Sequence, residues 1–117
     1  MRKKNLTHAE LLVMKCIWDT PKDLVLSEIV AMVNERYNKD WKPQTVSTYL
    51  SHLVQKEFLK MTRNGKIYTY QSLVNEYDYF HKCFANFLCF WGFDSAIDFM
   101  KTYVENREKT HDKIHEK

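Results

Sequence analysis

The sequence predicts a mainly α-helical protein with one small β-hairpin, divided into an N-terminal unit over residues 1–73 and a C-terminal helical region over residues 74–117. Only 2 Gly and 2 Pro occur in 117 residues, of which 44% are hydrophobic, and this composition favours ordered helices. Apolar residues recur at helical spacing in five segments, whereas one stretch in the middle switches to extended residues. After that stretch the composition changes, and 10 of the 17 aromatic residues fall between Tyr77 and Tyr103.

The first helix is expected to start near Thr7, because the segment from Thr7 to Glu10 has the Ser/Thr-x-x-Glu form of a capping box. Its residues are apolar on nearly all sides, which predicts a central position in the core. Thr20-Pro21-Lys22 is expected to end it. A second helix is expected from about Leu26 to Tyr37, and either Asp23 or Ser27 could cap it.

The third helix is expected from Pro43 to about Glu57, since proline suits the first helical turn. Two strands are then expected at roughly Leu59–Arg63 and Lys66–Gln71. Asn64-Gly65 is expected at the tip between them, because this pair accepts the positive φ angles of a type I′ turn. A helix whose outer face offers hydrogen bonds, followed by a basic hairpin, is the layout of a winged-helix DNA-binding domain.

The outer face of the third helix and the basic residues around it form the candidate DNA-binding site. Neutral hydrogen-bonding groups can bind base edges, and basic groups can contact phosphates. Such side chains also simply keep a helix soluble, so that interpretation stays open. The charge distribution favours DNA, because residues 1–73 carry 12 Lys/Arg against 7 Asp/Glu, whereas residues 74–117 carry 6 against 8. The candidates are Lys42, Gln44, Thr45, Ser47, Thr48, Ser51, His52, Lys56, Arg63 and Lys66, with Lys60 beside them.

The C-terminal region is expected to form two helices separated by Gly92. Aromatic residues of the first helix are spaced 3, 4, 3, 4, as in an a/d seam, and Asp94 or Ser95 starts the second. Two such helices cannot bury their own apolar surface, so we expect a homodimer, with packing onto the N-terminal unit as the alternative. Cys83 and Cys89 are expected to be buried small hydrophobic side chains. The candidate dimerisation residues are Tyr77, Phe80, Phe84, Phe87, Trp91, Ile97, Met100 and Val104.

Several functions are not expected. The sequence has no Ser/His/Asp arrangement, Gly-rich phosphate loop or paired-carboxylate motif, so we expect neither an enzyme nor a cofactor. His111 and His115 are four residues apart but lack a third ligand, so no metal site is expected. No apolar run of about 18 residues occurs, which predicts no membrane insertion. Three cysteines without CxxC spacing, and a start that lacks a signal peptide, predict a cytoplasmic protein.

Four segments of the chain together resemble a known family. They read LTHAELLVMKCIWD, LSEIVAMVNE, WKPQTVSTYLSHLVQKEFL and RNGKIYTYQSLVNEYDY, and the run from Trp41 to Leu53 is the most specific part. The chain resembles the penicillinase-repressor family of bacterial regulators (the BlaI/MecI/CopY type). The resemblance implies an N-terminal winged helix and a C-terminal dimerisation region. It also implies repression of an operon, such as one for β-lactam resistance or a related stress, by occupancy of double-stranded operator DNA.

The chain departs from that family in three places. Relatives often carry Lys or Arg in the recognition helix, whereas residues 43–55 contain neither, so the operator sequence cannot be borrowed. A winged helix that contacts proteins and has lost DNA affinity is the alternative that this neutral face leaves open. In the β-lactam branch the resemblance implies a membrane sensor-protease that cuts an Asn-Phe bond, and the matching pair here is Asp98-Phe99. The paired Cys-x-Cys motifs of the copper-responsive branch are absent.

Overall fold

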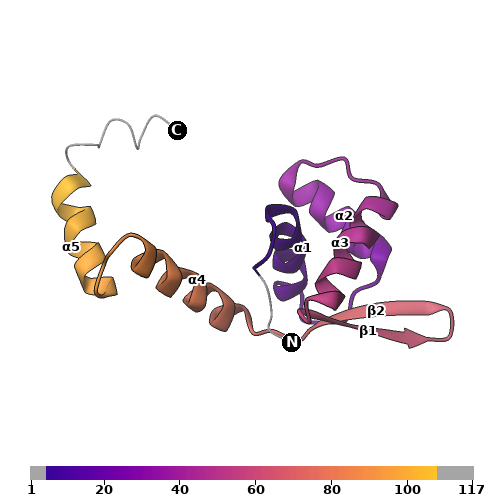
Figure 1. Ribbon diagram of the computed structural model, residues 1–117. Helices are drawn as coiled ribbons and strands as arrows, with labels where there is room; N and C mark the ends of the chain where they lie inside the picture. Colours follow the sequence, from indigo (N-terminus) through magenta and orange to yellow (C-terminus); the bar gives the residue numbers. More distant parts are fainter. Residues whose placement is uncertain (1–4, 108–117) are drawn as a thin grey trace. The chain divides into compact units, whose positions relative to one another are not determined.

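The computed structural model describes residues 5–107, which fold into five helices and one two-stranded antiparallel sheet (Figure 1). The chain divides after Glu76 into two compact units, and each is described by itself. Within the described residues, no helix is long and apolar enough to cross a membrane. The elements in chain order are α1 (His8–Trp18), α2 (Leu26–Tyr37), α3 (Pro43–Gln55), β1 (Leu59–Asn64), β2 (Ile67–Ser72), α4 (Glu76–Phe90) and α5 (Ala96–Arg107).

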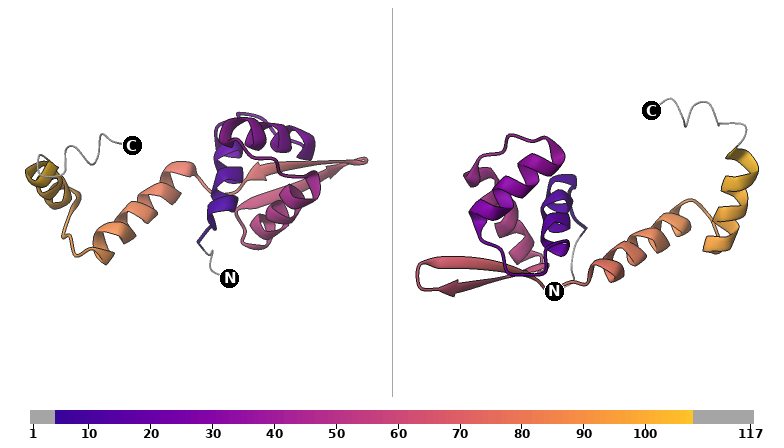
Figure 2. Two further views of the ribbon diagram at one scale, coloured as in Figure 1. Left: turned by 90° about the horizontal axis from the view of Figure 1, so that it is seen from above. Right: turned by 180° about the vertical axis from the view of Figure 1, so that it is seen from behind.

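The first unit is built around a core shared by α1, α2, α3 and the base of the hairpin. Each of the three helices packs against the other two, and the hairpin extends past them into solvent (Figure 2). The apolar stripes that the sequence places at helical spacing point inward, because burial of apolar surface is the main force that holds such a small domain together. The fully buried side chains include Val13, Met14, Cys16, Leu24, Ile29, Val33, Val46, Leu50, Leu53, Phe58 and Leu59.

The ends of α1 and α2 are closed by glutamate side chains. The capping box of α1 is confirmed, since Thr7 Oγ1 accepts from the Glu10 amide at 3.2 Å and Glu10 Oε1 accepts from the Thr7 amide at 3.0 Å. The expected cap of α2 is wrong, because Val25 is the N-cap and its amide donates to Glu28 Oε1 at 3.0 Å. Asp23 instead accepts a 2.9 Å hydrogen bond from Gln71 Nε2, which ties the α1–α2 loop to the hairpin.

The tip of the hairpin differs by one residue from the expected one. Asn64 still pairs with Ile67, so the two-residue loop is Gly65-Lys66 rather than Asn64-Gly65. Gly65 has φ 70°, whereas Lys66 is not among the residues with positive φ. A type I′ turn needs positive φ at both loop positions, and glycine at the first position alone fits a type II′ turn. The hairpin is confirmed, but the expected turn type is wrong.

The segment after β2 is fixed against α1. Trp18 Nε1 donates to the Val74 carbonyl at 2.8 Å and to Ser72 Oγ at 3.0 Å. Lys15 pairs with Glu76 at the start of α4 and lies 3.1 Å from Asp19. The first unit therefore extends to the first residue of α4.

The second unit consists of α4 and α5 around a small aromatic cluster. Phe99 is its centre, with ring centroids 5.9 Å from Phe84, 5.6 Å from Phe87 and 5.3 Å from Phe93. No described residue of either helix is buried. Cys83 and Cys89 are both exposed, so the expectation that they are buried is wrong, since α4 has only α5 to cover it within the unit. Cys16 of α1 is buried.

Candidate nucleic-acid interface

The outer face of α3 displays the neutral residues that the sequence assigned to it. Its buried stripe turns inward, and the opposite side of the helix is left to solvent. Thr48 Oγ1 donates to the Gln44 carbonyl at 3.1 Å, so this hydroxyl is tied to the helix backbone while its lone pairs stay accessible. Of the candidate residues on this helix, Gln44, Thr48, Ser51 and His52 are exposed, and Thr45 and Ser47 are half-buried.

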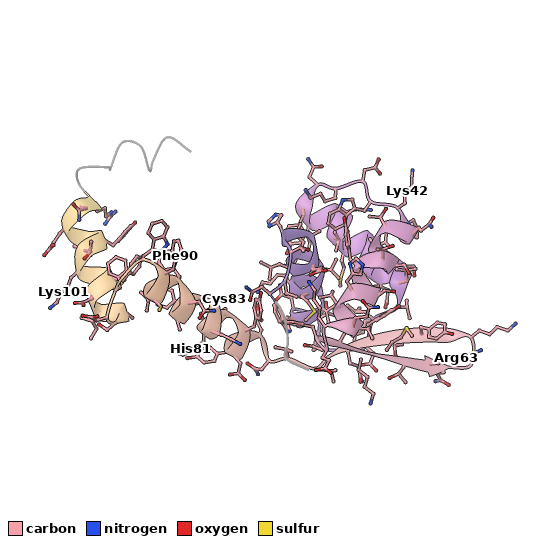
Figure 3. The ribbon with its side chains drawn as sticks, in the orientation of Figure 1. Lys42, Arg63, His81, Cys83, Phe90 and Lys101 are labelled. Carbon is pink, nitrogen blue, oxygen red and sulfur yellow. The ribbon has the colours of Figure 1, made fainter. Side chains whose placement is uncertain are left out.

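Basic side chains lie at both ends of this face. Lys42 is the N-cap of α3, and Arg63 lies on β1 toward the hairpin tip (Figure 3). The Arg63 guanidinium is 5.7 Å from the centre of the Tyr68 ring, and its Nε donates to the Gly65 carbonyl at 2.7 Å. Tyr68 is the cross-strand partner of Arg63, so both lie on one face of the hairpin. Lys66 is exposed in the hairpin loop, and Lys60 is exposed on β1, three residues before Arg63.

Lys56 does not join these exposed cations. It is the C-cap of α3 and its side chain is only 20% exposed. Its Nζ donates to Glu10 Oε1 at 2.6 Å and to the Asn5 carbonyl at 3.2 Å. The other carboxylate oxygen of Glu10 lies 3.6 Å from His52 Nδ1. The structure thus brings His52 and Lys56 together around a carboxylate of α1, and the Lys56 ammonium already has two acceptors.

The turn that leads into α3 is held by one asparagine. Asn34 Nδ2 donates to the Trp41 carbonyl at 3.0 Å, and Asn34 Oδ1 accepts from the Trp41 amide at the same distance. The Trp41 ring packs edge-on against Tyr49 of α3, with centroids 5.0 Å apart. Asn38 ends α2 in the left-handed region at φ 54°, which asparagine tolerates better than most residues. These contacts fix the backbone just before Lys42.

The second unit exposes every residue that the sequence assigned to dimerisation. Trp91 is 61% exposed and Ile97 is 68% exposed, values that are high for large apolar side chains. Phe84 and Phe87 are partly covered by Phe99, but each keeps more than a third of its surface open. The other exposed members are Tyr77, Phe80, Met100 and Val104.

Asp98 and Phe99 lie in the first turn of α5. The Asp98 amide donates to Ser95 Oγ at 3.1 Å, and the Phe99 amide donates to the Ser95 carbonyl at 3.1 Å. Ser95 therefore caps this helix, as one of the two expected alternatives had it. The peptide bond between Asp98 and Phe99 lies within this turn, and Phe99 is the centre of the aromatic cluster.

Residues 5–107 contain no group of three or more His, Cys, Asp or Glu side chains that could hold a metal ion. His111 and His115 lie outside the described residues.

Sequence reasoning found the exposed face of α3 and the basic hairpin, but it missed the residues that hold them in place. Glu10 was assigned only to a capping box, and its ion pair with Lys56 spans 46 positions, so no local pattern could indicate it. Asn34 is a polar residue in an otherwise ordinary helix, and nothing in its spacing predicts a contact with Trp41. Tyr68 could have been found, because a cross-strand aromatic beside an arginine follows from the hairpin register.

Comparison with known proteins gives a consistent result over most of the chain. The family model for "Penicillinase repressor" matches residues 6–116. The methicillin resistance regulatory protein MecI of Staphylococcus aureus strain N315 is 32% identical over 114 residues, which cover 95% of this chain and 88% of that protein. The penicillinase repressor of Bacillus licheniformis is 25% identical over 111 residues, covering 95% and 84%.

Two solved structures resemble the N-terminal part. The solution structure of the DNA-binding domain of the repressor BlaI has a TM-score of 0.57 and 30% identity, over 68% of this chain and 94% of that chain. Monomeric Bacillus licheniformis BlaI in complex with the blaP half-operator has a TM-score of 0.54 over the same shares. The expected winged helix is thereby confirmed. The chain belongs to the penicillinase-repressor family and is a DNA-binding repressor.

Proposed function

We propose that this protein is a dimeric transcriptional repressor that occupies double-stranded operator DNA and blocks transcription from the adjacent promoter. The observation that carries the proposal is the exposed neutral face of α3, flanked by Lys42 at one end and the basic hairpin at the other. The solved complex of BlaI with a half-operator supports DNA as the partner of this fold. A repressor of a bacterial operon would act in the cytoplasm.

We assign base recognition to α3 and phosphate contacts to its surroundings. The helix carries hydroxyl, amide and imidazole groups but no Lys or Arg, so its base contacts would be hydrogen bonds without a net charge. The candidates for base contacts are Gln44, Thr45, Ser47, Thr48, Ser51 and His52. Lys42, Arg63 and Lys66 would neutralise phosphates and fix the register of the helix in the major groove.

We assign homodimer formation to the second unit. Its two helices leave the whole aromatic seam exposed, and an apolar surface of this kind usually marks an interface. A two-fold dimer would bring two recognition helices to two half-sites, and the combined affinity would exceed that of either unit alone.

We assign the relief of repression to the second unit. A membrane sensor-protease is a candidate partner, with the bond between Asp98 and Phe99 as its target. Cleavage there would separate the Ser95 cap from Phe99, which contacts Phe84, Phe87 and Phe93. The dimer would then lose its organised seam. Comparing the mass of the repressor from cells before and after induction tests this route, because an intact chain during derepression would exclude it. The genes that this repressor would control are those of a β-lactam-resistance operon or of an operon for a related stress.

A mobility-shift titration with the intergenic DNA upstream of the chain's own gene tests the proposal as a whole. Thr48→Ala and His52→Ala should each reduce operator affinity by about 1–3 kcal/mol while leaving binding to random-sequence DNA nearly unchanged. Arg63→Ala should weaken binding to both DNAs and flatten the salt slope by about one. Equal losses on both DNAs for all three variants would contradict this division of roles. No affinity for any duplex would favour a winged helix that contacts proteins instead.

A further inference from the structure

One carboxylate lies behind the C-terminal half of α3. Glu10 is 2% exposed, and it is the charged residue found among the buried ones in the described chain. Its two oxygens face α3, with Oε1 2.6 Å from Lys56 Nζ and Oε2 3.6 Å from His52 Nδ1. Both partners border the surface proposed to meet DNA. A side chain from the first helix therefore touches two residues at the edge of the recognition face.

This arrangement changes what Lys56 can do. Its ammonium is satisfied by Glu10 and by the Asn5 carbonyl, and its side chain is mostly covered. Burial acts to raise the pKa of Glu10, but the hydrogen bonds from Lys56 and from the Thr7 amide, together with the nearby positive charge, lower it below its ordinary value. Glu10 is thus ionised at neutral pH, and it offsets the charge of Lys56 beside α3.

The same carboxylate also lies near His52, although its 3.6 Å distance from Nδ1 is longer than a hydrogen bond. Because Nδ1 is the ring nitrogen that faces Glu10 Oε2, Nε2 is the nitrogen left for an outside partner. His52 is half exposed, so this second nitrogen can reach a base or a phosphate.

We infer that Glu10 is a positioning residue for DNA binding, which withdraws Lys56 from the phosphate backbone. The inference rests on the proposed DNA-binding function. Every lysine that contacts a phosphate adds affinity for all sequences alike, so the withdrawal of Lys56 lowers the affinity for operator DNA and for random-sequence DNA by the same factor. Glu10 thereby reduces by one the number of lysines that contact phosphates, and with it the salt dependence of binding.

Glu10→Gln in the full-length protein tests this inference, because glutamine keeps the shape and the capping acceptor but removes the charge. With a random-sequence duplex, the plot of log affinity against log salt should become steeper by about 0.9, the value of one added phosphate contact. The affinity for the operator and for random-sequence DNA should rise by a similar factor, because a phosphate contact carries no sequence information. Glu35→Gln is the matched control, since it removes the same charge from an exposed position of α2 and should keep the wild-type slope.

Variants of Lys56 separate positioning from a merely structural role. Lys56→Gln should keep the wild-type slope, and adding it to Glu10→Gln should return the steeper slope to the wild-type value. An unchanged slope in folded Glu10→Gln would overturn the inference. A Lys56→Gln slope that is flatter by about one would overturn it as well, even if Glu10→Gln did not fold, because Lys56 would then already contact a phosphate. If the wild-type protein bound no duplex, the proposed function would fail as well. If the wild type binds DNA normally, an unchanged slope in Glu10→Gln or a flatter slope in Lys56→Gln contradicts the inference alone.

Discussion

The two units of the chain solve the problem of burial in opposite ways. The first unit buries a continuous set of side chains from three helices and a hairpin, and it satisfies its one buried carboxylate with an ion pair. The second unit holds ten of the seventeen aromatic residues, yet neither of its helices has a buried residue. The aromatic residues are therefore concentrated in the unit that leaves them exposed, whereas the core of the first unit is built mostly from aliphatic side chains.

This difference predicts whether the stability of each unit depends on protein concentration. The first unit has the core of an independent domain, so its stability should not depend on protein concentration. The second unit has an aromatic cluster around Phe99 but no interior, so its order should depend on a partner that covers the seam. Changes that affect one unit should leave the other nearly unaffected.

The largest expected effect comes from a charge in the seam. Truncation of a large aromatic in a packed interface costs about 3–5 kcal/mol, and a buried carboxylate without a partner costs more. Phe84→Asp should therefore give a monomer whose first unit remains folded, as measured by sedimentation and circular dichroism. Phe90→Asp is the matched control, because Phe90 is 78% exposed and lies off the 3, 4, 3, 4 seam. A wild-type protein that stays monomeric at tens of micromolar, as an order of magnitude, would show that the seam is not an interface.

The next effect is a cavity in the first unit. Leu50 is fully buried in α3, and its truncation to Ala should destabilise the first unit by about 2–5 kcal/mol. Urea unfolding should give the same loss at low and high protein concentration. The corresponding change in the second unit, Phe87→Ala, should instead give a loss that depends on concentration. A concentration-dependent loss for Leu50→Ala would mean that the first unit needs the dimer in order to fold.

A smaller effect follows from the pKa of Glu10. The pKa of Glu10 is lower in the folded protein than its ordinary value of 4.5. The ion pair therefore stabilises the first unit fully at pH values above 4.5. That stabilisation is lost as the pH falls through the lowered pKa. The urea midpoint of the wild type should therefore drop on acidification below pH 4.5, and Glu10→Gln should have a flatter profile there. Parallel profiles for the two proteins would remove Glu10 as a source of acid sensitivity.

The smallest effect concerns the backbone on either side of α3. Glu57 has φ 68°, a left-handed conformation that costs a residue with a Cβ roughly 1–2 kcal/mol and costs glycine little. Glu57→Gly should stabilise the first unit by about 1 kcal/mol after the added chain entropy is counted. Asn38→Gly at φ 54° should give a smaller gain, because asparagine tolerates this region. Thermal unfolding of the two variants measures both gains. A larger gain for Asn38→Gly than for Glu57→Gly would show that the positive φ is not the cause.

Most of the fold could be predicted from the sequence because it depends on local patterns. The Thr7 capping box, the apolar stripe of α3 and the presence of the hairpin all follow from residues within a few positions of each other. The N-cap of α2 could not, since a bridge between Leu24 and Tyr70 keeps the preceding segment extended and the cap falls on Val25. Pairing of two distant segments overrode the local preference for Asp or Ser.

The candidate site was predictable in its composition but not in its internal contacts. The neutral face of α3 is visible in the sequence because helical spacing gathers its residues on one side. Nothing in the local sequence distinguishes Lys56 from the exposed Lys60, four positions later. In the described residues 5–107, however, Lys56 donates to Glu10 and Asn5, and Lys60 does not. Which lysines reach DNA depends on tertiary contacts, and these are set by side chains far away in the chain.

The positions of the three tryptophans give this protein its own optical probes. Trp18 donates its indole hydrogen to Ser72 and Val74, and Trp41 packs edge-on against Tyr49, so both chromophores sense the integrity of the first unit. Trp91 is 61% exposed and lies at the end of the aromatic seam. Its emission should shift to shorter wavelength when a partner covers the seam. Unlabelled protein carrying Trp91→Phe, compared with wild type, would therefore separate an unfolding transition from a dissociation transition in one fluorescence titration.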